Sequence, residues 1–181
     1  MAEREKSALY PGATWAECIE LIKKISSFNL KAVSYQELAK KYGLSSTTTK
    51  SFTAKIGAAK QFGLVTTAQG NTIHLTDASK KLLYPTGESV RGVELTCFAQ
   101  APLYSKLISK YDGMALPAQE LLANILMNEY RITRSVKDSA AKCFLESAEQ
   151  LELIKGGILC YTDAENEPEE PTAKQLSLIH I

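Results

Sequence analysis

The sequence has few of the residues from which metal and redox sites are built. It contains two histidines and a single tryptophan, and no two of its four cysteines form a CxxC pair. A structural zinc ion needs about four Cys or His ligands close together, so we expect no metal site and no bound cofactor. Each cysteine lies among apolar residues, which predicts buried thiols that stay reduced. The cysteines are Cys18, Cys97, Cys143 and Cys160.

Motifs typical of enzymes are also missing. The chain has no Walker-type phosphate-binding loop, no GxGxxG after a strand, no GxSxG and no HExxH. Residues 45–49 are rich in Ser and Thr, but neither His74 nor His180 is close to them in the sequence. No catalytic triad is therefore predicted, and we expect the protein not to be an enzyme.

Long hydrophobic runs are absent as well. No apolar stretch approaches the ~20 residues of a membrane-spanning helix. The first residues, MAEREKSALYPG, lack the apolar core of a signal peptide. Hydrophobic residues make up 45% of the chain and charged residues 23%, which is typical of a folded globular protein. These features predict a cytoplasmic protein without a membrane partner.

The chain does have a marked division of charge. Residues 1–87 hold 12 Lys/Arg and 6 Asp/Glu, a balance of +6, and residues 88–181 hold 9 and 14, a balance of −5. Together these give the net charge of +1. A basic half and an acidic half predict two domains with different surfaces, and Pro85-Thr86-Gly87 is the expected boundary. Any attraction for nucleic acid should lie in the basic half.

The first half opens with two predicted helices. Thr14 and Ser34 each have a glutamate three residues later, which is the spacing of a capping box. Apolar residues at helical spacing extend the first helix to about Phe28. The second helix is expected to end at Gly43, where a positive φ is least costly.

A third helix, with an unusual charge, is the basis of the functional prediction. It is expected to run from an N-cap at Ser45 or Ser46 to about Phe62 and to be ended by Gly63. It carries three lysines and no carboxylate. The elements expected after it are strands at 64–67 and 72–75 around a turn at 69–71, and a helix from Thr76 to Pro85.

The second half repeats this pattern. Residues 56–65 correspond to residues 145–154 in their apolar positions, whereas residues 35–38 correspond to residues 118–121. The first offset is 89 and the second is 83, so the second copy needs a longer second helix or a longer turn. Chance similarity of amphipathic helices is the alternative to a duplication. The elements expected here are helices from Glu88, from Pro102, after Pro117 and over 136–150, and a hairpin across Gly156-Gly157.

The order helix, short strand, helix, helix, hairpin, followed by a helix start at Leu75-Thr76, resembles winged helix-turn-helix proteins. Prokaryotic repressors of the MarR and ArsR type have similar hairpin-to-helix junctions, although this chain lacks metal-ligand cysteines. The resemblance implies a mainly α fold with small β-hairpins (α+β), made of two tandem winged helix-turn-helix domains. These domains are expected at 12–87 (basic) and 88–162 (acidic).

Both ends of the chain are expected to lie outside the domains. Residues 1–11 are predicted to be a mobile lead. Residues 163–181 are predicted to be an acidic disordered tail, beginning with DAENEPEE. The final LSLIHI, residues 176–181, resembles a translated sequencing adapter, so no function is expected of it.

The winged-helix resemblance implies double-stranded DNA as the partner. The third helix of such a domain can enter the major groove while the hairpin touches the flanking backbone. The helix has no arginine, the commonest reader of guanine, which favours weakly specific binding of phosphates. Regulation of transcription is the expected role, and defence or mobile-element functions are equally compatible. The candidate DNA-binding residues are Ser46, Thr47, Thr48, Lys50, Ser51, Lys55, Gln69, Asn71 and Thr72.

A protein-interaction scaffold without nucleic-acid binding is the alternative. Small residues let another backbone approach closely, so Ala54, Gly57 and Ala58 would contact a protein partner or a second copy in a homodimer. The third helix of the second copy mixes acidic and basic residues, so this copy is expected to pack on the first or to form a dimer. Arg131 and Arg134, which precede that helix, can still contact a DNA backbone.

Overall fold

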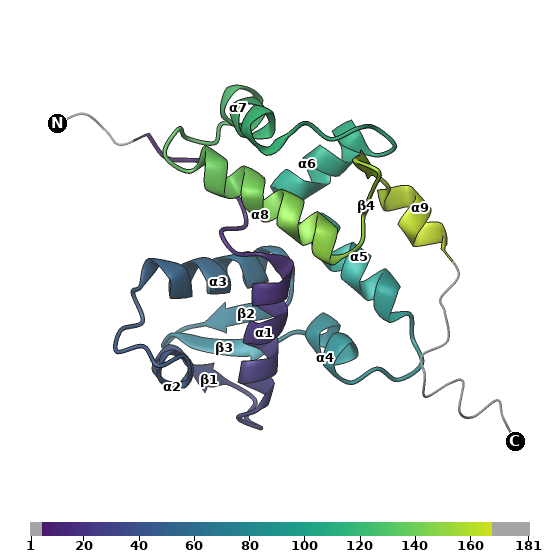
Figure 1. Ribbon diagram of the computed structural model, residues 1–181. Helices are drawn as coiled ribbons and strands as arrows, with labels where there is room; N and C mark the ends of the chain where they lie inside the picture. Colours follow the sequence, from purple (N-terminus) through teal and green to yellow (C-terminus); the bar gives the residue numbers. More distant parts are fainter. Residues whose placement is uncertain (1–4, 168–181) are drawn as a thin grey trace, which may run out of the picture.

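The computed structural model describes residues 5–167 and shows a mixed α+β protein (Figure 1). These residues form nine helices, a three-stranded antiparallel sheet and a two-stranded one, which confirms a mainly α fold with small hairpins. In this part of the chain, no helix combines the length and apolarity that crossing a membrane requires. The helices are α1 (Trp15–Ser26), α2 (Tyr35–Lys41), α3 (Lys50–Gln61), α4 (Asp77–Leu83), α5 (Val90–Gln100), α6 (Pro102–Tyr111), α7 (Gln119–Glu129), α8 (Lys137–Gln150) and α9 (Tyr161–Asn166). The strands are β1 (Val33–Ser34), β2 (Val65–Ala68), β3 (Thr72–Leu75), β4 (Ile154–Lys155) and β5 (Ile158–Leu159).

The two predicted capping boxes are confirmed. The Thr14 hydroxyl accepts a hydrogen bond from the Glu17 amide at 3.3 Å, and the Glu17 carboxylate accepts one from the Thr14 amide at 2.7 Å. Ser34 and Glu37 exchange the same two bonds at 3.2 and 3.1 Å. These bonds satisfy amides that have no partner inside the helix, which explains why α1 and α2 begin where they do.

Removing either cap is expected to destabilise the protein by about 1 kcal/mol, because an amide at the helix start then loses its acceptor. The substitutions are Thr14→Ala and Ser34→Ala, and urea denaturation followed by circular dichroism measures the free energy of unfolding. Ser105→Ala, at an exposed position within α6, is the matched control and should change this energy by less than about 0.5 kcal/mol. Cap variants no less stable than the control would contradict the assignment.

The third helix begins later than expected. α3 starts at Lys50 with Thr49 as its N-cap, so the prediction of an N-cap at Ser45 or Ser46 is wrong. The Ser46 hydroxyl instead accepts a hydrogen bond from the Thr48 amide at 3.2 Å. Ser and Thr side chains compete for nearby amides in this way and favour turns over helix interiors. A run of such residues therefore forms a loop before α3.

The predicted hairpin forms and gains a third strand. β2 pairs with β3 in a register that places Val65 opposite Leu75, and β1 joins the other edge of β3 to give the order β1-β3-β2. Gly70 and Asn71 in the connecting turn have φ values of 83° and 55°. Glycine and asparagine adopt this left-handed conformation more readily than other residues, which explains their place in the turn.

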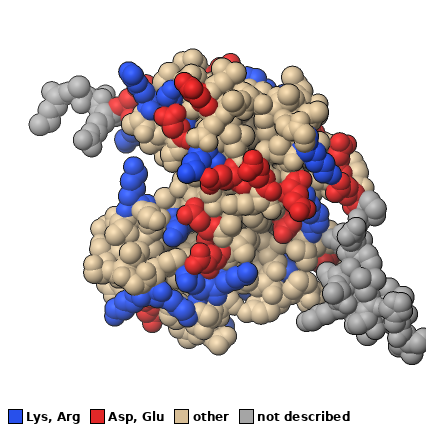
Figure 2. Space-filling model, in the orientation of Figure 1, with Lys and Arg blue, Asp and Glu red and all other residues tan. Residues whose placement is uncertain are grey.

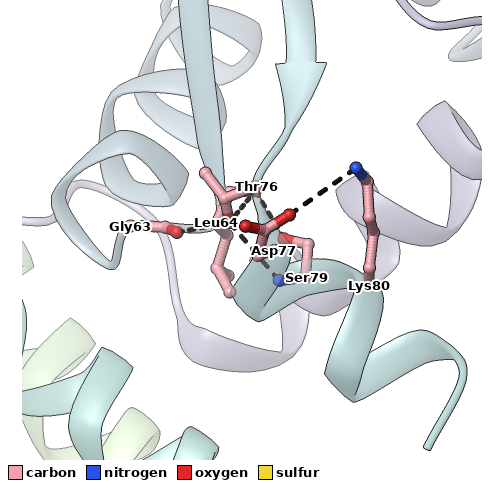
Figure 3. Close-up of polar contacts among 6 residues, drawn as sticks. All are labelled: Gly63, Leu64, Thr76, Asp77, Ser79 and Lys80. Carbon is pink, nitrogen blue, oxygen red and sulfur yellow. Dashed lines mark hydrogen bonds and ion pairs between the residues drawn. The ribbon is translucent and has the colours of Figure 1, made fainter.

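Thr76 connects the hairpin to α4 (Figure 3). Its hydroxyl donates to the Gly63 carbonyl at 2.6 Å, with a longer contact of 3.1 Å to the Leu64 carbonyl. The same oxygen accepts from the Ser79 amide at 3.3 Å, which confirms the helix start predicted at Thr76. Ser79 is fully buried, and its own hydroxyl donates to the Leu64 carbonyl. This cluster fixes the beginning of β2 against the beginning of α4.

The elements of the second half follow the same order as those of the first. In the first half, α1 is followed by β1, which pairs with the hairpin strand β3. In the second half, α6 is followed by Ala115, which forms a single bridge to the hairpin strand β5. Two helices, a hairpin and a short helix follow in each half, and α5 connects the halves. α7 has 11 residues where α2 has 7, so of the two predicted alternatives, a longer second helix or a longer turn, the structure shows the longer helix.

The turns that follow α3 and α8 have nearly the same geometry. The amide of Leu64 donates to the carbonyl five residues earlier at 2.9 Å, and the amide of Leu153 does the same. The residue before each is left-handed, with φ of 68° at Gly63 and 56° at Glu152. The two turns are 89 residues apart along the chain, which is one of the offsets seen in the sequence.

One hydrophobic core runs through both halves. Phe98 of α5 lies against Phe62, Tyr104 and Phe144, with ring centroids 6.4, 5.0 and 6.1 Å away. Trp15 of α1 joins this aromatic cluster at 5.3 Å from Phe62. All five rings are at most 4% exposed. The contact between the halves is therefore apolar and well packed.

The segment before α1, residues 7–12, lies between the two halves. The Ala8 amide donates to the Arg131 carbonyl at 2.9 Å, and the Gln61 side chain of α3 donates to a carbonyl of the segment at 2.9 Å. The prediction of a mobile lead over residues 1–11 is therefore wrong for residues 7–11. Its partners lie far away in the sequence, so local composition carried no information about them. Residues 1–4 lie outside the described part of the chain.

The C-terminal side also differs from expectation. α9 forms where a disordered tail was expected from residue 163, so that prediction is wrong for residues 163–166. Tyr161 fixes this helix, because its hydroxyl donates to the Leu95 carbonyl at 2.9 Å and its amide donates to the Asp112 carboxylate at 2.8 Å. The rest of the predicted tail, with LSLIHI at its end, lies outside the described residues from 168 onward.

Candidate nucleic-acid interface

The candidate DNA-binding residues come from a segment without carboxylates. Residues 38–76 contain five lysines and no Asp or Glu. The loop before α3, the start of α3 and the β2–β3 turn lie at the same end of the first half, on the left in Figure 1. We call these pieces, residues 45–51 and 69–72, the loop–turn surface.

Tyr35 at the start of α2 connects the pieces of this surface. Its amide donates to the Asn71 carbonyl at 2.9 Å, and its ring stands edge-on to Phe52 of α3 with centroids 6.3 Å apart. Phe52 is buried in the core. The turn of the hairpin is therefore held in a defined position relative to α3.

The hydroxyls of the loop are partly engaged with one another. Ser46 Oγ lies 2.8 Å from Thr48 Oγ1. Ser46 and Thr47 also line a shallow pocket of about 310 Å³ together with Gln36 and Lys40 of α2. Gln36 and Lys40 were not among the candidates from the sequence. The lack of carboxylates from residue 38 onward was the signal that could have included Lys40.

The two candidate lysines of α3 point to different sides. Lys50 is exposed beside the exposed Ser51, within the loop–turn surface. Lys55 packs over the ring of Tyr42 with Nζ 4.7 Å from the centroid, and Lys24 of α1 lies over the same ring at 4.9 Å. Five helical positions rotate a side chain by about 140°, so the two lysines cannot face one groove together. The structure leaves Lys55 outside the loop–turn surface.

Tyr42 gives Lys55 a structural reason to lie where it does. Burial raises the pKa of the Tyr42 phenol to about 12, with the nearby Glu20 carboxylate adding to the shift, so the ring is neutral at physiological pH. A neutral aromatic face attracts an ammonium group by about 0.5–2 kcal/mol. Lys55 therefore stabilises the contact between α3 and α2.

The hairpin turn supplies the remaining candidates. Gln69 and Asn71 are exposed at its tip, and the half-buried Thr72 pairs with Ala68 where β3 begins. Side-chain amides and hydroxyls can donate to phosphates and can meet base edges as donor or acceptor. The β2–β3 turn that carries these residues lies at the same end of the first half as the start of α3 (Figure 1).

The small residues of α3 are largely used inside this chain. Ala58 is 1% exposed and belongs to the core. A Cβ built on Gly12 would lie 3.3 Å from the Cβ of Ala54, so the segment before α1 already passes close to Ala54. Gly57 has open space beside it among the described residues. These three residues therefore offer no continuous patch to a protein partner or a second copy.

Three of the four cysteines are buried. Cys18, Cys97 and Cys143 are free and buried, as expected, while Cys160 is half-buried. Burial raises the pKa of the Cys97 and Cys143 thiols to about 11 and raises that of Cys18 further, so little thiolate exists at neutral pH. Within residues 5–167, no cluster of three or more His, Cys, Asp or Glu side chains is placed to hold a metal ion.

The chain was compared with protein-family models, with curated proteins and with solved structures, and none of the three comparisons gave a match. The functional assignment consequently rests on the geometry and charge of the chain itself.

Proposed function

We propose that the first half is a winged helix-turn-helix domain that binds duplex DNA through the loop–turn surface. The element order α1-β1-α2-α3-β2-β3 and the sheet order β1-β3-β2 support this fold. In such a domain the strand before the second helix pairs with the returning strand of the hairpin, as β1 does with β3. The third helix and the hairpin then present themselves together to a groove and its flanking backbone.

The observation that carries the proposal is the make-up of the loop–turn surface. It combines exposed hydroxyls, side-chain amides and Lys50 with no carboxylate. Phosphate oxygens need donors, and a nearby carboxylate would repel them. On the face shown in Figure 2, acidic side chains gather along the junction of the two halves, while the left part of the lower half is mostly uncharged, with basic side chains and a small acidic patch at its lower edge. That part lies at the end of the first half that carries the loop–turn surface.

The last carboxylate before the loop–turn surface in the sequence is that of Glu37. Glu37 accepts hydrogen bonds from the amide and the hydroxyl of Ser34, at 3.1 and 2.9 Å, and these bonds lower its pKa. The Glu37 carboxylate is thus used to cap the start of α2. Its hydrogen bonds orient the carboxylate toward the Ser34 cap.

In the proposed binding mode, the loop–turn surface contacts the phosphate backbone and has little preference for base sequence. α3 contains no arginine, and bidentate contact of arginine with guanine is the commonest specific contact in the major groove. Regulation of transcription by a cytoplasmic tandem winged-helix protein is the proposed role. The repeated element order of the second half supports its assignment as the second winged helix.

The proposal predicts salt-dependent binding that responds to Lys50. Affinity for a random duplex of about 24 base pairs should fall steeply between about 50 and 200 mM salt, and Lys50→Gln should reduce the slope of log K against log salt by about 0.9. Fluorescence anisotropy of a labelled duplex measures both. Lys106→Gln, at an exposed position on α6, is the matched control and should leave the slope unchanged.

Lys55→Gln separates the loop–turn surface from a general effect of charge. It should leave the slope as in the wild type and lower the free energy of unfolding by about 0.5–1 kcal/mol, because the cation over Tyr42 is lost. If Lys55→Gln changed the salt slope and Lys50→Gln did not, the DNA interface would lie outside the loop–turn surface. A wild-type protein that binds no duplex at low salt would end the proposal.

A further inference from the structure

A second group of cations lies in the loop between α7 and α8. Arg131 and Arg134 are exposed, and neither makes an ion pair among the described residues. Guanidinium groups stay charged at every working pH and can contact two phosphate oxygens at once. Two carboxylates lie near the loop. Asp138 follows it in the sequence, and Glu5 is two residues before Ser7, whose hydroxyl accepts a hydrogen bond from the Thr133 amide. Its charge is positive but is less uniform than that of the loop–turn surface.

The α7–α8 loop repeats a pattern from the loop before α3. In both loops, two residues with hydroxyl groups stand two positions apart. A lysine follows two positions later, and the helix begins at that lysine. The two hydroxyls lie 2.8 Å apart in the first loop and 3.3 Å apart in the second. The matching residues are Ser46 and Thr133, Thr48 and Ser135, and Lys50 and Lys137.

The segment before α1 limits the distance between the α7–α8 loop and the loop before α3. The Ala8 amide is bonded to the Arg131 carbonyl, and a Cβ built on Gly12 would lie 3.3 Å from the Cβ of Ala54. Ala54 is one helical turn from Lys50. Four residues of chain span at most about 14 Å. With the two contacts and one turn of helix added, the Arg131 backbone lies within about 30 Å of the Lys50 backbone. One turn of B-form DNA is about 34 Å long.

The two loops also open toward the same side of the molecule. In Figure 1, α3 and α8 both begin at the left and run to the right, one in each half. Figure 2 shows basic side chains along this left edge on both sides of the junction, interspersed with acidic ones in the upper half. A straight duplex along this edge would pass both loops within about one turn.

We propose that Arg131 and Arg134 bind the backbone of the same DNA duplex that the loop–turn surface contacts, so that each half holds one stretch of a single site. This inference rests on the proposed function of the first half. It assigns the acidic second half a direct part in binding. Its contribution comes from two arginines, whereas the first half contributes hydroxyls, amides and a lysine.

The test removes the two charges while keeping the backbone. Asparagine tolerates the left-handed conformation of Arg131, whose φ is 60°, so the variant combines Arg131→Asn with Arg134→Gln. Loss of two phosphate contacts should reduce the salt slope by about 1.8. Between about 200 and 50 mM salt, the variant should then gain about tenfold less affinity than the wild type. Lys106→Gln with Lys142→Gln removes the same charge from the same half and is the control.

The outcomes distinguish this inference from the function on which it rests. A wild-type slope in the arginine variant overturns the inference and leaves DNA binding by the first half intact. An equal loss in the lysine control also overturns it, because net charge alone would then explain the result. No binding by the wild type ends both proposals. Arg134→Gln alone, at an exposed position outside regular structure, should reduce the slope by about 0.9 and guards against misfolding of the double variant.

Discussion

Replacement of Phe98 by alanine is expected to lower the free energy of unfolding by about 3–5 kcal/mol, the usual range for a buried phenylalanine. Phe98 is fully buried and stands between Phe62 of the first half and Phe144 of the second. The substitution leaves a cavity where the two halves meet, which neither half can fill by itself. Both halves should therefore be weakened together, and unfolding should remain a single transition at a lower denaturant concentration.

The single tryptophan makes this measurable. Trp15 packs on Phe62 and reports by fluorescence on the core where the halves meet, while circular dichroism reports on the helices of both halves. The two signals should change at the same urea concentration in the wild type and in Phe98→Ala. Leu121→Ala, at a position 56% exposed, should change the free energy of unfolding by less than about 0.5 kcal/mol. Separate transitions for the two signals would show that the shared core does not couple the halves.

The second large effect is expected at Thr76. Thr76→Val keeps the shape of the side chain, removes the donor to the Gly63 carbonyl and removes the cap on the Ser79 amide. The bond to the Gly63 carbonyl is part-buried, so its loss costs about 1 kcal/mol. The lost cap costs about 1 kcal/mol more, so a loss of about 2 kcal/mol is expected. Urea denaturation measures the change. β2 and α4 are both fixed at this point, so the hairpin should lose protection from hydrogen exchange first.

Thr76→Ser is the matched control, because serine retains the hydroxyl and differs by one methyl group. It should recover most of the stability that valine loses. If Thr76→Ser and Thr76→Val were equally destabilised, the effect would come from packing of the methyl group. The hydrogen bonds in Figure 3 would then not hold the hairpin against α4.

Local signals in the sequence located most of the elements. The caps at Thr14 and Ser34 were predictable because all the atoms involved lie within four residues. The hairpin was predictable from Gly70 and Asn71 for the same reason. The start of α3 was missed because hydroxyl side chains that can cap a helix can also hold a turn, and the choice depends on neighbouring residues. The predicted N-cap is Ser45 or Ser46, whereas the helix begins at Lys50.

The contacts that determine the candidate site were harder to predict from the sequence. The turn of Lys55 toward Tyr42, and the burial of Ala58 in the core, follow from the packing of α3 against α1 and α2. Helical periodicity alone could place Lys50 and Lys55 on different sides, but it could not tell which side remains open. The position of the segment before α1 was beyond prediction, because Arg131 is its partner from the other half.

The start of α1 has a consequence for synthesis of the chain. The Trp15 amide donates to the Ser147 hydroxyl, and the Ala16 amide donates to the Gln150 side chain, across 132 and 134 residues. A ribosome adds about 5–20 residues per second, so roughly 7–26 seconds pass before the acceptor of the Trp15 amide exists. During that interval the nascent first half exposes the apolar surface that Phe98 and Phe144 later cover. This is the period in which the protein is most exposed to aggregation and to chaperones.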